Sequence, residues 1–417
     1  MTSNSESSFS DRPTPLAIDG GQPVCAYPLP AWPVHGPDEI DAVTEVLRSG
    51  RTNYWTGSEG KSFEREFADH CGVRYGVAVA NGSLALELAL VSLGIGHGDE
   101  VIVTPRTFIA SASSVVLRGA LPIFADVDLD SQNITAETIE PCITERTRAV
   151  IVVHLAGQPC DMDPIMDLAE SRGLKVIEDC AQAHGALYKG RPVGSIGHIA
   201  AFSFCQDKIM STGGEGGMLV TNDESLWQRA WAYKDHGKNY QSVHRQDHPV
   251  GFRWLHDSFG SNWRLTEMQS AIGRLQLRKL PEWHGLRARN ADILRQGLQR
   301  MPGIRLPQLP AYLQHAWYKF FFFVHRSQLQ PEWDRDCLVA AISAEGVPCF
   351  TGICPELYLE QAFIGSGGKH VRLSAARRLG EDSLMLLVHP TLEPDDMDIM
   401  VSAVGKVFNA ATKRRDD

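Results

Sequence analysis

The sequence predicts an α/β protein, in which a large domain with a mostly parallel sheet flanked by helices precedes a smaller C-terminal α+β domain. Short apolar runs alternate with helical patterns up to residue 222, and the pattern then changes. Continuous apolar strands separated by helices are typical of a parallel sheet covered on both faces. A chain of 417 residues is also long enough for two domains.

The expected elements follow in order along the chain. Strands are expected at 77–80, 101–104, 122–125, 149–153, 175–178, 199–204 and 218–221, with helices at 84–93, 109–118 and 163–172. Right-handed crossovers place the carboxyl ends of the parallel strands on one side of the sheet. A long amphipathic helix is expected at 265–280, ended by Pro281, and a final helix at about 394–410.

We divide the chain into three parts. Residues 1–20 carry little to bury and are expected to form a flexible tail. Residues 21–284 are expected to form the large domain, including the long helix, and residues 285–417 the small domain.

Composition excludes several classes of function. A formal net charge of −10 argues against a non-specific surface for nucleic acids or anionic membranes. The nine cysteines are scattered without a Cys-x-x-Cys pair, which argues against a disulfide framework or a zinc site and suits a reducing cytosol. The chain shows neither a signal peptide nor an apolar run of about 20 residues, so we expect a soluble cytoplasmic protein.

Lys208 is the first candidate for catalysis. It lies between the apolar run 199–204 and a loop with four glycines in five residues, 213–217. Burial of its stem would lower the pKa of the amine, as a Schiff-base lysine requires. Taken alone, the position is better explained by a surface lysine at a strand-to-turn junction, and only the neighbouring motifs favour catalysis.

Other polar residues follow the predicted strand ends, where open α/β sheets bind ligands. The turn formed by Asn81, Gly82 and Ser83 opens a helix, so its free N–H groups make an anion site, although such turns are also common helix caps. Asp179 ends a strand, and its local alternative is an N-cap. Phe108 and Ser203 lie near the same edge, where each is equally compatible with a structural role.

Together these residues fit one cofactor, pyridoxal phosphate (PLP). It needs a lysine, an acid beside its pyridine nitrogen and an anion cradle for its phosphate. Lys208, Asp179 and the Gly82–Ser83 turn supply these groups, and Phe108 is available to lie against the ring. An ionised Asp179 would keep the ring nitrogen protonated, which makes the ring an electron sink.

From about residue 30 to its C-terminus the chain resembles the DegT/StrS-type sugar aminotransferases, which have the aspartate aminotransferase fold (PLP fold type I). Five segments carry the resemblance: NGSLAL at 81–86, PRTFIA at 105–110, EDCAQAHG at 178–185, the lysine segment 203–217, and GSNWRLTEMQ at 260–269. The last is similar to the family's segment that crosses the dimer interface. Ser83 stands where the family more often has threonine, and either residue offers an N–H and a hydroxyl.

The resemblance implies a role for each residue. Lys208 would form the Schiff base and shuttle the proton, and Asp179 would pair with the pyridine nitrogen. Phe108 would stack on the ring, and Gln182 would contact the cofactor. The phosphate would be held by Gly82, Ser83, Ser203 and, from the other subunit, Asn262. The resemblance therefore implies a homodimer with shared active sites, no metal, and small-molecule substrates.

A lysine at position 208 favours transamination, because the family's sugar dehydratases carry histidine there. The expected reaction moves an amino group from an amino acid, L-glutamate by preference, to a nucleotide-linked 4-keto or 3-keto hexose in amino-sugar, polysaccharide or antibiotic biosynthesis. An inosose aminotransferase is an alternative, followed by a PLP-dependent dehydratase or a non-catalytic PLP-binding regulator. Polar residues of 233–260 are a candidate surface for substrate phosphates, with an ordinary solvated loop as the alternative.

A nicotinamide dehydrogenase is the rival from another enzyme class. The glycine cluster at 213–217 does not have the spacing Gly-x-Gly-x-x-Gly after a first strand, and no acidic residue follows at a suitable distance. The sequence therefore favours the PLP chemistry over dinucleotide binding.

Overall fold

The computed structural model describes residues 15–248, 250–365 and 371–413. Its largest sheet has seven strands in the order β1-β9-β8-β5-β4-β2-β3. They are β1 (Tyr75–Val79), β2 (Glu100–Val103), β3 (Leu121–Phe124), β4 (Thr147–Val153), β5 (Lys175–Asp179), β8 (Ile199–Ser203) and β9 (Gly217–Thr221). Strand β9 is antiparallel to both of its neighbours, and the other adjacent pairs are parallel. The predicted α/β fold with a mostly parallel sheet is confirmed.

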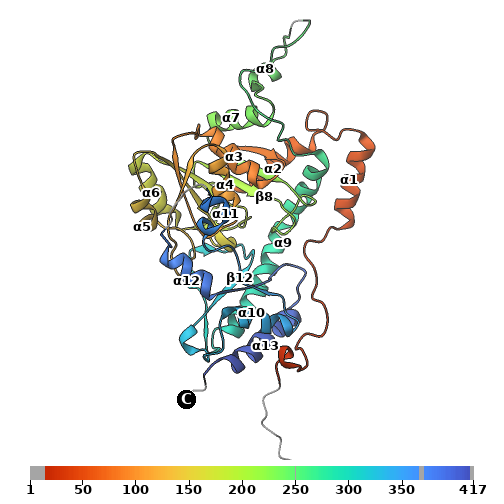
Figure 1. The fold of residues 1–417 in the computed structure, drawn as a ribbon. Helices are drawn as coiled ribbons and strands as arrows, with labels where there is room; N and C mark the ends of the chain where they lie inside the picture. The colour runs from red at the N-terminus through yellow and green to blue at the C-terminus, as the bar shows by residue number, and fades with distance from the viewer. Residues whose placement is uncertain (1–14, 249, 366–370, 414–417) are drawn as a thin grey trace, which may run out of the picture.

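Helices cover both faces of this sheet because alternate residues of its buried strands point to opposite sides. Ala201 and Leu219 join a core cluster with α3, whereas Phe202 and Met218 join a second cluster with α2 and α9. The helices of this part are α1 (Pro37–Ser49), α2 (Glu59–Cys71), α3 (Gly82–Ser92), α4 (Ala110–Leu117), α5 (Ala136–Ile139), α6 (Met162–Arg172), α7 (Glu224–Lys234), α8 (Tyr240–His244) and α9 (Glu267–Leu298). Helix α8 projects beyond the sheet at the top of Figure 1.

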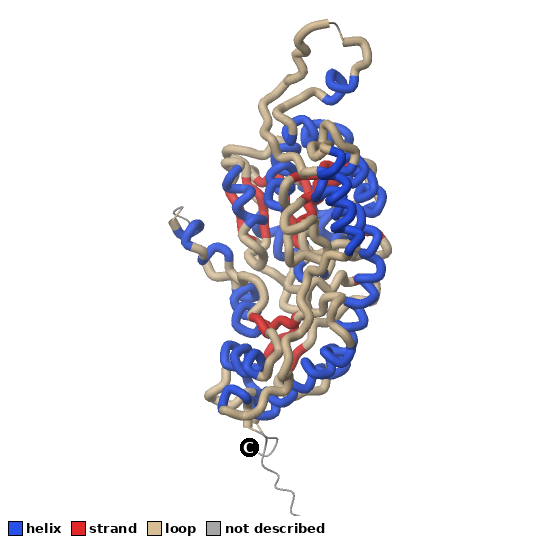
Figure 2. Tube along the Cα trace, turned by 90° about the vertical axis from the view of Figure 1, so that its right-hand side faces the viewer, coloured by secondary structure: helices blue, strands red, loops and turns tan. Residues whose placement is uncertain are grey.

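The C-terminal part has its own antiparallel sheet, in the order β10-β12-β14-β13. Its central strand β12 has the sequence FFFFV and is buried along its whole length. The remaining elements are β10 (Ile304–Arg305), β12 (Phe320–Val324), β13 (Cys349–Phe350), β14 (Ser383–Leu386), α10 (Arg335–Ala344), α11 (Gln361–Ile364), α12 (Ser374–Asp382) and α13 (Pro394–Ala411). A small third sheet joins β11 (Leu313–Gln314) to β6 (Leu187–Tyr188) and β7 (Arg191–Pro192). Figure 2 shows the two larger groups of strands well separated along the molecule.

Helix α9 corrects the prediction that Pro281 ends the long helix. It continues through Pro281 to Leu298. Proline in a helix interior costs about 3 kcal/mol. Buried side chains on both sides outweigh this cost: Leu280 and Trp283 pack in the cluster below the large sheet, and Leu294 packs in the C-terminal cluster. Each such side chain contributes about 1.5–3 kcal/mol.

The N-terminal segment crosses to the C-terminal part. Residues 1–14 of the expected tail lie outside the described residues, but Ala17–Asp19 form a short 3-10 helix and Leu16 is buried in the C-terminal cluster. The amide of Ala17 donates to the Glu345 carboxylate at 2.8 Å. Figure 1 shows this red segment descending from α1 to α13. We propose a domain division within α9, with residues 15–29 assigned to the smaller domain.

Among the described residues no helix combines the length and the apolar character that a membrane span requires.

Candidate active site

A cavity of about 550 Å³ opens beside the carboxyl ends of β5 and β8 and the N-terminus of α3. It is lined by Gly82, Ser83, Phe108, Asp179, Gln182, Ser203 and Lys208, which are all of the predicted site residues except Asn262. The structure thus brings together residues that are spread over more than a hundred positions of the sequence.

Lys208 lies in the loop after β8, with 16% of its side chain exposed. Its Nζ is 3.4 Å from the hydroxyl of Tyr318 and 3.5 Å from Asp207 Oδ1. The backbone carbonyl of Lys208 accepts a hydrogen bond from Trp32 Nε1 at 2.8 Å. The main chain of the lysine is therefore fixed, while its amine faces polar groups at the cavity wall.

Asp179 is the last residue of β5 and is 4% exposed. Oδ2 accepts a hydrogen bond from Ser111 Oγ at 2.7 Å, and Oδ1 accepts one from the amide of Ala181 at 3.1 Å. Burial raises the pKa of this carboxyl, and the two hydrogen bonds and the charge of Lys208 oppose the rise. No helix begins here, so the N-cap alternative is wrong. A buried carboxylate of this kind fits a cationic partner such as a protonated ring nitrogen.

The first turn of α3 has the geometry expected of an anion cradle. Asn81 caps the helix through Oδ1, which accepts the amide of Leu84 at 2.9 Å. The amides of Gly82 and Ser83 precede the first intrahelical hydrogen bonds and lie at the cavity, where the helix dipole favours an anion. A Cβ on Gly82 would lie 2.5 Å from the Cβ of Ser203, so only glycine lets the helix approach β8 this closely.

The remaining predicted residues differ in their surroundings. Phe108 is 62% exposed at the cavity, which leaves its ring face open. Gln182 is buried and its Oε1 accepts the amide of Ala156 at 2.8 Å, so it also supports a neighbouring loop. Asn262 is exposed and its backbone pairs with Asp235, outside this cavity.

Several residues at the site were not predicted. Ser111 holds Asp179 and also contacts Thr107 Oγ1 at 3.0 Å. These two residues stand four positions apart beside a predicted helix, which is a weak signal in the sequence. Trp32 and Tyr318 are far from Lys208 in the sequence, and no local pattern connects them.

A second polar cluster, His154, Glu178 and Cys180, has ligand atoms within 4.8 Å of one another. The side chains of His154 and Glu178 already have hydrogen-bond partners within the fold. His154 Nε2 is 3.0 Å from Glu178 Oε2, and its Nδ1 accepts the amide of Cys160. Glu178 also accepts three amides of the loop at 194–197. Burial raises the pKa of the Cys180 thiol, so it is protonated. This cluster therefore has a structural role, in which Glu178 holds the loop at 194–197.

Part of the predicted phosphate-binding surface at 233–260 is wrong. Lys234 is fully buried and forms an ion pair with Glu64 at 2.7 Å. Lys238 pairs with the buried Asp235 at 2.9 Å. These two lysines are occupied within the fold and are unavailable to a substrate phosphate.

The site residues fit PLP, since they supply a lysine, a buried carboxylate and an anion cradle around one cavity. Residues 33–405 match the model of the DegT/DnrJ/EryC1/StrS aminotransferase family. The chain is 37% identical to dTDP-3-amino-3,4,6-trideoxy-alpha-D-glucose transaminase of Streptomyces venezuelae, covering 87% of this chain and 90% of that protein.

Two further comparisons agree. The chain is 41% identical to L-glutamine:2-deoxy-scyllo-inosose aminotransferase of Streptomyces fradiae, covering 70% of each chain. The solved aminotransferase structure from Psychrobacter cryohalolentis is 53% identical, superposes with a TM-score of 0.90, and covers 92% of this chain and 99% of its own. The protein is therefore a PLP-dependent transaminase, and the chain belongs to the DegT/DnrJ/EryC1/StrS aminotransferase family.

Proposed function

We propose that the protein transfers an amino group from L-glutamate to a nucleotide-linked 4-keto or 3-keto hexose. The observation that carries the proposal is the placement of Lys208 beside Asp179 and the first turn of α3 in one cavity. The relative from Streptomyces venezuelae, which is named as an amino-sugar transaminase, supports a sugar as the acceptor.

Each side chain has a defined task in this proposal. When bound, PLP supplies an electron sink for the negative charge that develops at the substrate carbon. Lys208 Nζ accepts the proton that leaves the α carbon of the donor and later returns one to the carbon of the acceptor. Asp179 remains ionised with the help of Ser111 and stabilises positive charge on the ring nitrogen. The amides of Gly82 and Ser83 and the hydroxyl of Ser203 bind the phosphate, Phe108 packs on the ring, and Gln182 contacts it.

The proposal includes a cytoplasmic homodimer with shared sites. Asn262 is exposed and lies outside its own chain's cavity, which is consistent with a position at the site of a second copy. The aromatic side chains of Phe252, Trp254 and Phe259 are also 78–98% exposed in the projecting segment after α8. Large apolar side chains exposed together are typical of an interface.

An inosose aminotransferase is the second candidate, because the relative from Streptomyces fradiae has that name. One experiment decides between them. The purified protein, loaded with PLP, is titrated with L-glutamate and then with a panel of keto sugars and inososes. We expect glutamate to bleach the visible band of the lysine-bound cofactor and a nucleotide-linked keto sugar to restore it. Restoration by an inosose alone would favour the second candidate, and no bleaching by any amino donor would contradict both.

A further inference from the structure

A buried arginine next to the active site lacks a carboxylate partner. Arg287 on α9 is 1% exposed. Its Nη1 donates to the carbonyl oxygens of Trp317 and Tyr318 at 3.2 and 3.4 Å, but Nε and Nη2 have no hydrogen-bond partner among the described residues. Burial lowers the pKa of this guanidinium to about 9, so it is charged at neutral pH. A buried cation left with free donors is unfavourable unless an anion binds it.

Arg287 lines a cavity of about 250 Å³, separate from the one described above. Lys319 and His389 line it too, and Asp207 is the acidic residue at its wall. Burial lowers the pKa of Lys319 to about 8. The positive charges of Arg287 and Lys208 lower this pKa further, and the negative charge of Asp207 opposes the change. The pKa of His389 is about 3, chiefly because of burial, so this ring is neutral. Two cations, Arg287 and Lys319, therefore line the cavity with one carboxylate, and the cavity attracts a further anion.

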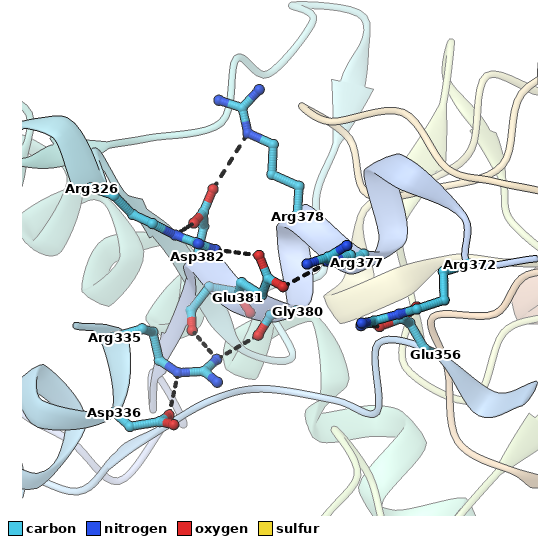
Figure 3. A network of polar contacts seen from close by, with 11 residues as sticks. Arg326, Arg335, Asp336, Glu356, Arg372, Arg377, Arg378, Gly380, Glu381 and Asp382 are labelled. Carbon is cyan, nitrogen blue, oxygen red and sulfur yellow. Dashed lines mark hydrogen bonds and ion pairs between the residues drawn. The ribbon is translucent and has the colours of Figure 1, made fainter. Parts of the chain in front are cut away.

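The arginines around α12 differ from Arg287 in their partners. Arg326, Arg372, Arg377 and Arg378 lie around α12, and each is paired with a glutamate or an aspartate (Figure 3). Arg335 in the same group pairs with Asp336 and also donates to two backbone carbonyls. Each arginine of that cluster has a carboxylate oxygen within 3.5 Å, whereas no ion pair of Arg287 is found among the described residues.

The small cavity is coupled to the catalytic lysine. Asp207 lines both cavities. The ring of Tyr318 is close to both lysines, with its centre 5.0 Å from Lys208 Nζ and 4.8 Å from Lys319 Nζ. Trp32 also lines the small cavity, and its Nε1 donates a hydrogen bond to the backbone carbonyl of Lys208. An anion bound here is therefore held one side chain away from the reacting amine.

The size of the cavity limits the anion. A volume of about 250 Å³ holds roughly eight water molecules and falls below the 300–1,000 Å³ usual for pockets that take whole drug-sized ligands. It accommodates a carboxylate on a short chain but not a sugar nucleotide.

We propose that this cavity is the subsite for a carboxylate of the amino donor and that Arg287, with Lys319 beside it, binds that carboxylate. The inference rests on the proposed function, because it assigns the anion to the donor. A phosphate group of the acceptor is the other source of an anion at this site, and the test below separates the two.

The test uses PLP-loaded protein and three variants, Arg287→Gln, Lys319→Gln and the control Arg289→Gln. Arg289 is on the same helix but donates to the carbonyl of Leu392 and does not line the cavity. Calorimetric titration with glutarate, a dicarboxylate without an amine, reports binding without turnover. We expect Arg287→Gln and Lys319→Gln to weaken glutarate, and glutamate in the donor half-reaction, by about 10- to 100-fold, as for a lost hydrogen bond to a charged group. Arg289→Gln should bind as the wild type does.

Each other outcome has a defined meaning. Unchanged glutarate binding and donor reaction in both cavity variants would overturn the inference. The inference would also be overturned if inorganic pyrophosphate bound in a manner that depends on Arg287 and glutarate did not bind. The subsite would then serve a phosphate of the acceptor. If Arg287→Gln does not fold, Lys319→Gln at a half-exposed position still decides the question. If the wild-type protein reacts with no amino donor, the proposed function itself is contradicted. If the wild type reacts and the Arg287→Gln variant reacts equally well, only this inference is contradicted.

Discussion

The indole N–H of Trp32 donates a 2.8 Å hydrogen bond to the backbone carbonyl of Lys208, across 176 positions of sequence. The same indole packs edge-on against Trp283 with ring centres 5.0 Å apart, and the guanidinium of Arg287 lies 5.2 Å from its ring centre. The N-terminal segment thus fixes the main chain of Lys208, the proposed catalytic lysine, and, through α9, connects it to the C-terminal part.

Removing only this donor should therefore affect the lysine. In Trp32→Phe an aromatic ring remains, but the carbonyl of Lys208 loses its partner. We expect a loss of about 1 kcal/mol in the free energy of unfolding and a reduced kcat with PLP content retained, measured by denaturant titration and steady-state assay. Trp333→Phe, at a partly buried position of the C-terminal cluster that lines neither cavity, is the control. Equal stability and kcat in the two variants would show that the hydrogen bond does not position the lysine.

Asp179→Asn should retain bound PLP but lose most turnover. The amide keeps the shape of the side chain but removes the charge that stabilises the protonated ring nitrogen. By analogy with the removal of other electrostatic stabilisers, kcat should fall by about 10²–10³-fold or more. The cofactor spectrum and the donor half-reaction measure the two effects separately. A fully active Asp179→Asn variant would refute the role assigned to this carboxylate.

Ser111→Ala should change the pH profile in a defined direction. Burial already raises the pKa of Asp179, and the hydrogen bond from Ser111 Oγ opposes the rise. Without that hydrogen bond the pKa rises further, and the carboxylate is ionised only at higher pH. The acidic limb of the kcat profile should therefore move to higher pH, while Ser113→Ala on the same helix leaves it in place. A uniform loss of activity at every pH would indicate a general structural role instead.

Gly82→Ala should weaken PLP binding, because the new Cβ would lie 2.5 Å from the Cβ of Ser203 and displace the first turn of α3. Equilibrium dialysis of PLP measures the loss. In the double variant with Ser203→Gly the clashing Cβ is absent, although the Ser203 hydroxyl is lost as well. We expect the double variant to bind PLP better than Gly82→Ala alone. No recovery would mean that another contact at the turn limits binding.

Buried neutral histidines should make the fold sensitive to acid. Burial lowers the pKa of both His184 and His315 to about 3. Between pH 6.5 and 3 the unfolded chain therefore binds protons that the folded chain excludes, and stability falls as pH falls, by up to about 1.4 kcal/mol per pH unit for each histidine.

His315→Asn tests this slope. Nδ1 of His315 accepts the amide of Trp317 at 2.8 Å, and an asparagine carbonyl can replace that acceptor without titrating. Thermal unfolding between pH 7 and pH 5 should show a shallower fall in Tm for this variant than for the wild type or for His244→Asn at an exposed position. The same slope in all three proteins would contradict the expectation.

Asn262→Ala tests the shared site. If Asn262 binds PLP phosphate in a second copy, the variant should remain dimeric by sedimentation but bind PLP more weakly. Mixing it with the inactive Lys208→Ala variant provides a further check. A hybrid dimer contains one site with Lys208 and a native partner Asn262, so activity at limiting PLP should rise above that of either variant alone. No recovery on mixing, with dimer exchange verified, would argue against a shared site.

The sequence predicted the strands of the large sheet and the residues at their ends because both follow local patterns. Apolar runs identify β5 and β8, and Asp179 is the last residue of β5 while Lys208 lies in the loop after β8. Ser111 and Trp32 were missed because each acts through one hydrogen bond to a residue distant in sequence. The prediction that Pro281 ends the helix was wrong because the low helix propensity of one proline is outweighed by buried side chains on both sides of it. That burial is visible only in the packed structure.

The continuity of α9 through Pro281 has a mechanical consequence. Pro281 has no N–H to donate to the carbonyl of Leu277, so the helix has its weakest rung there. Leu277, Leu280 and Trp283, on both sides of this rung, pack in the cluster under the large sheet, and α9 enters the C-terminal cluster only from Ala291 onward. Helices bend where their hydrogen-bond ladder is interrupted. Packing against the large sheet on both sides of Pro281 therefore supports α9 at the point where its own hydrogen bond is missing.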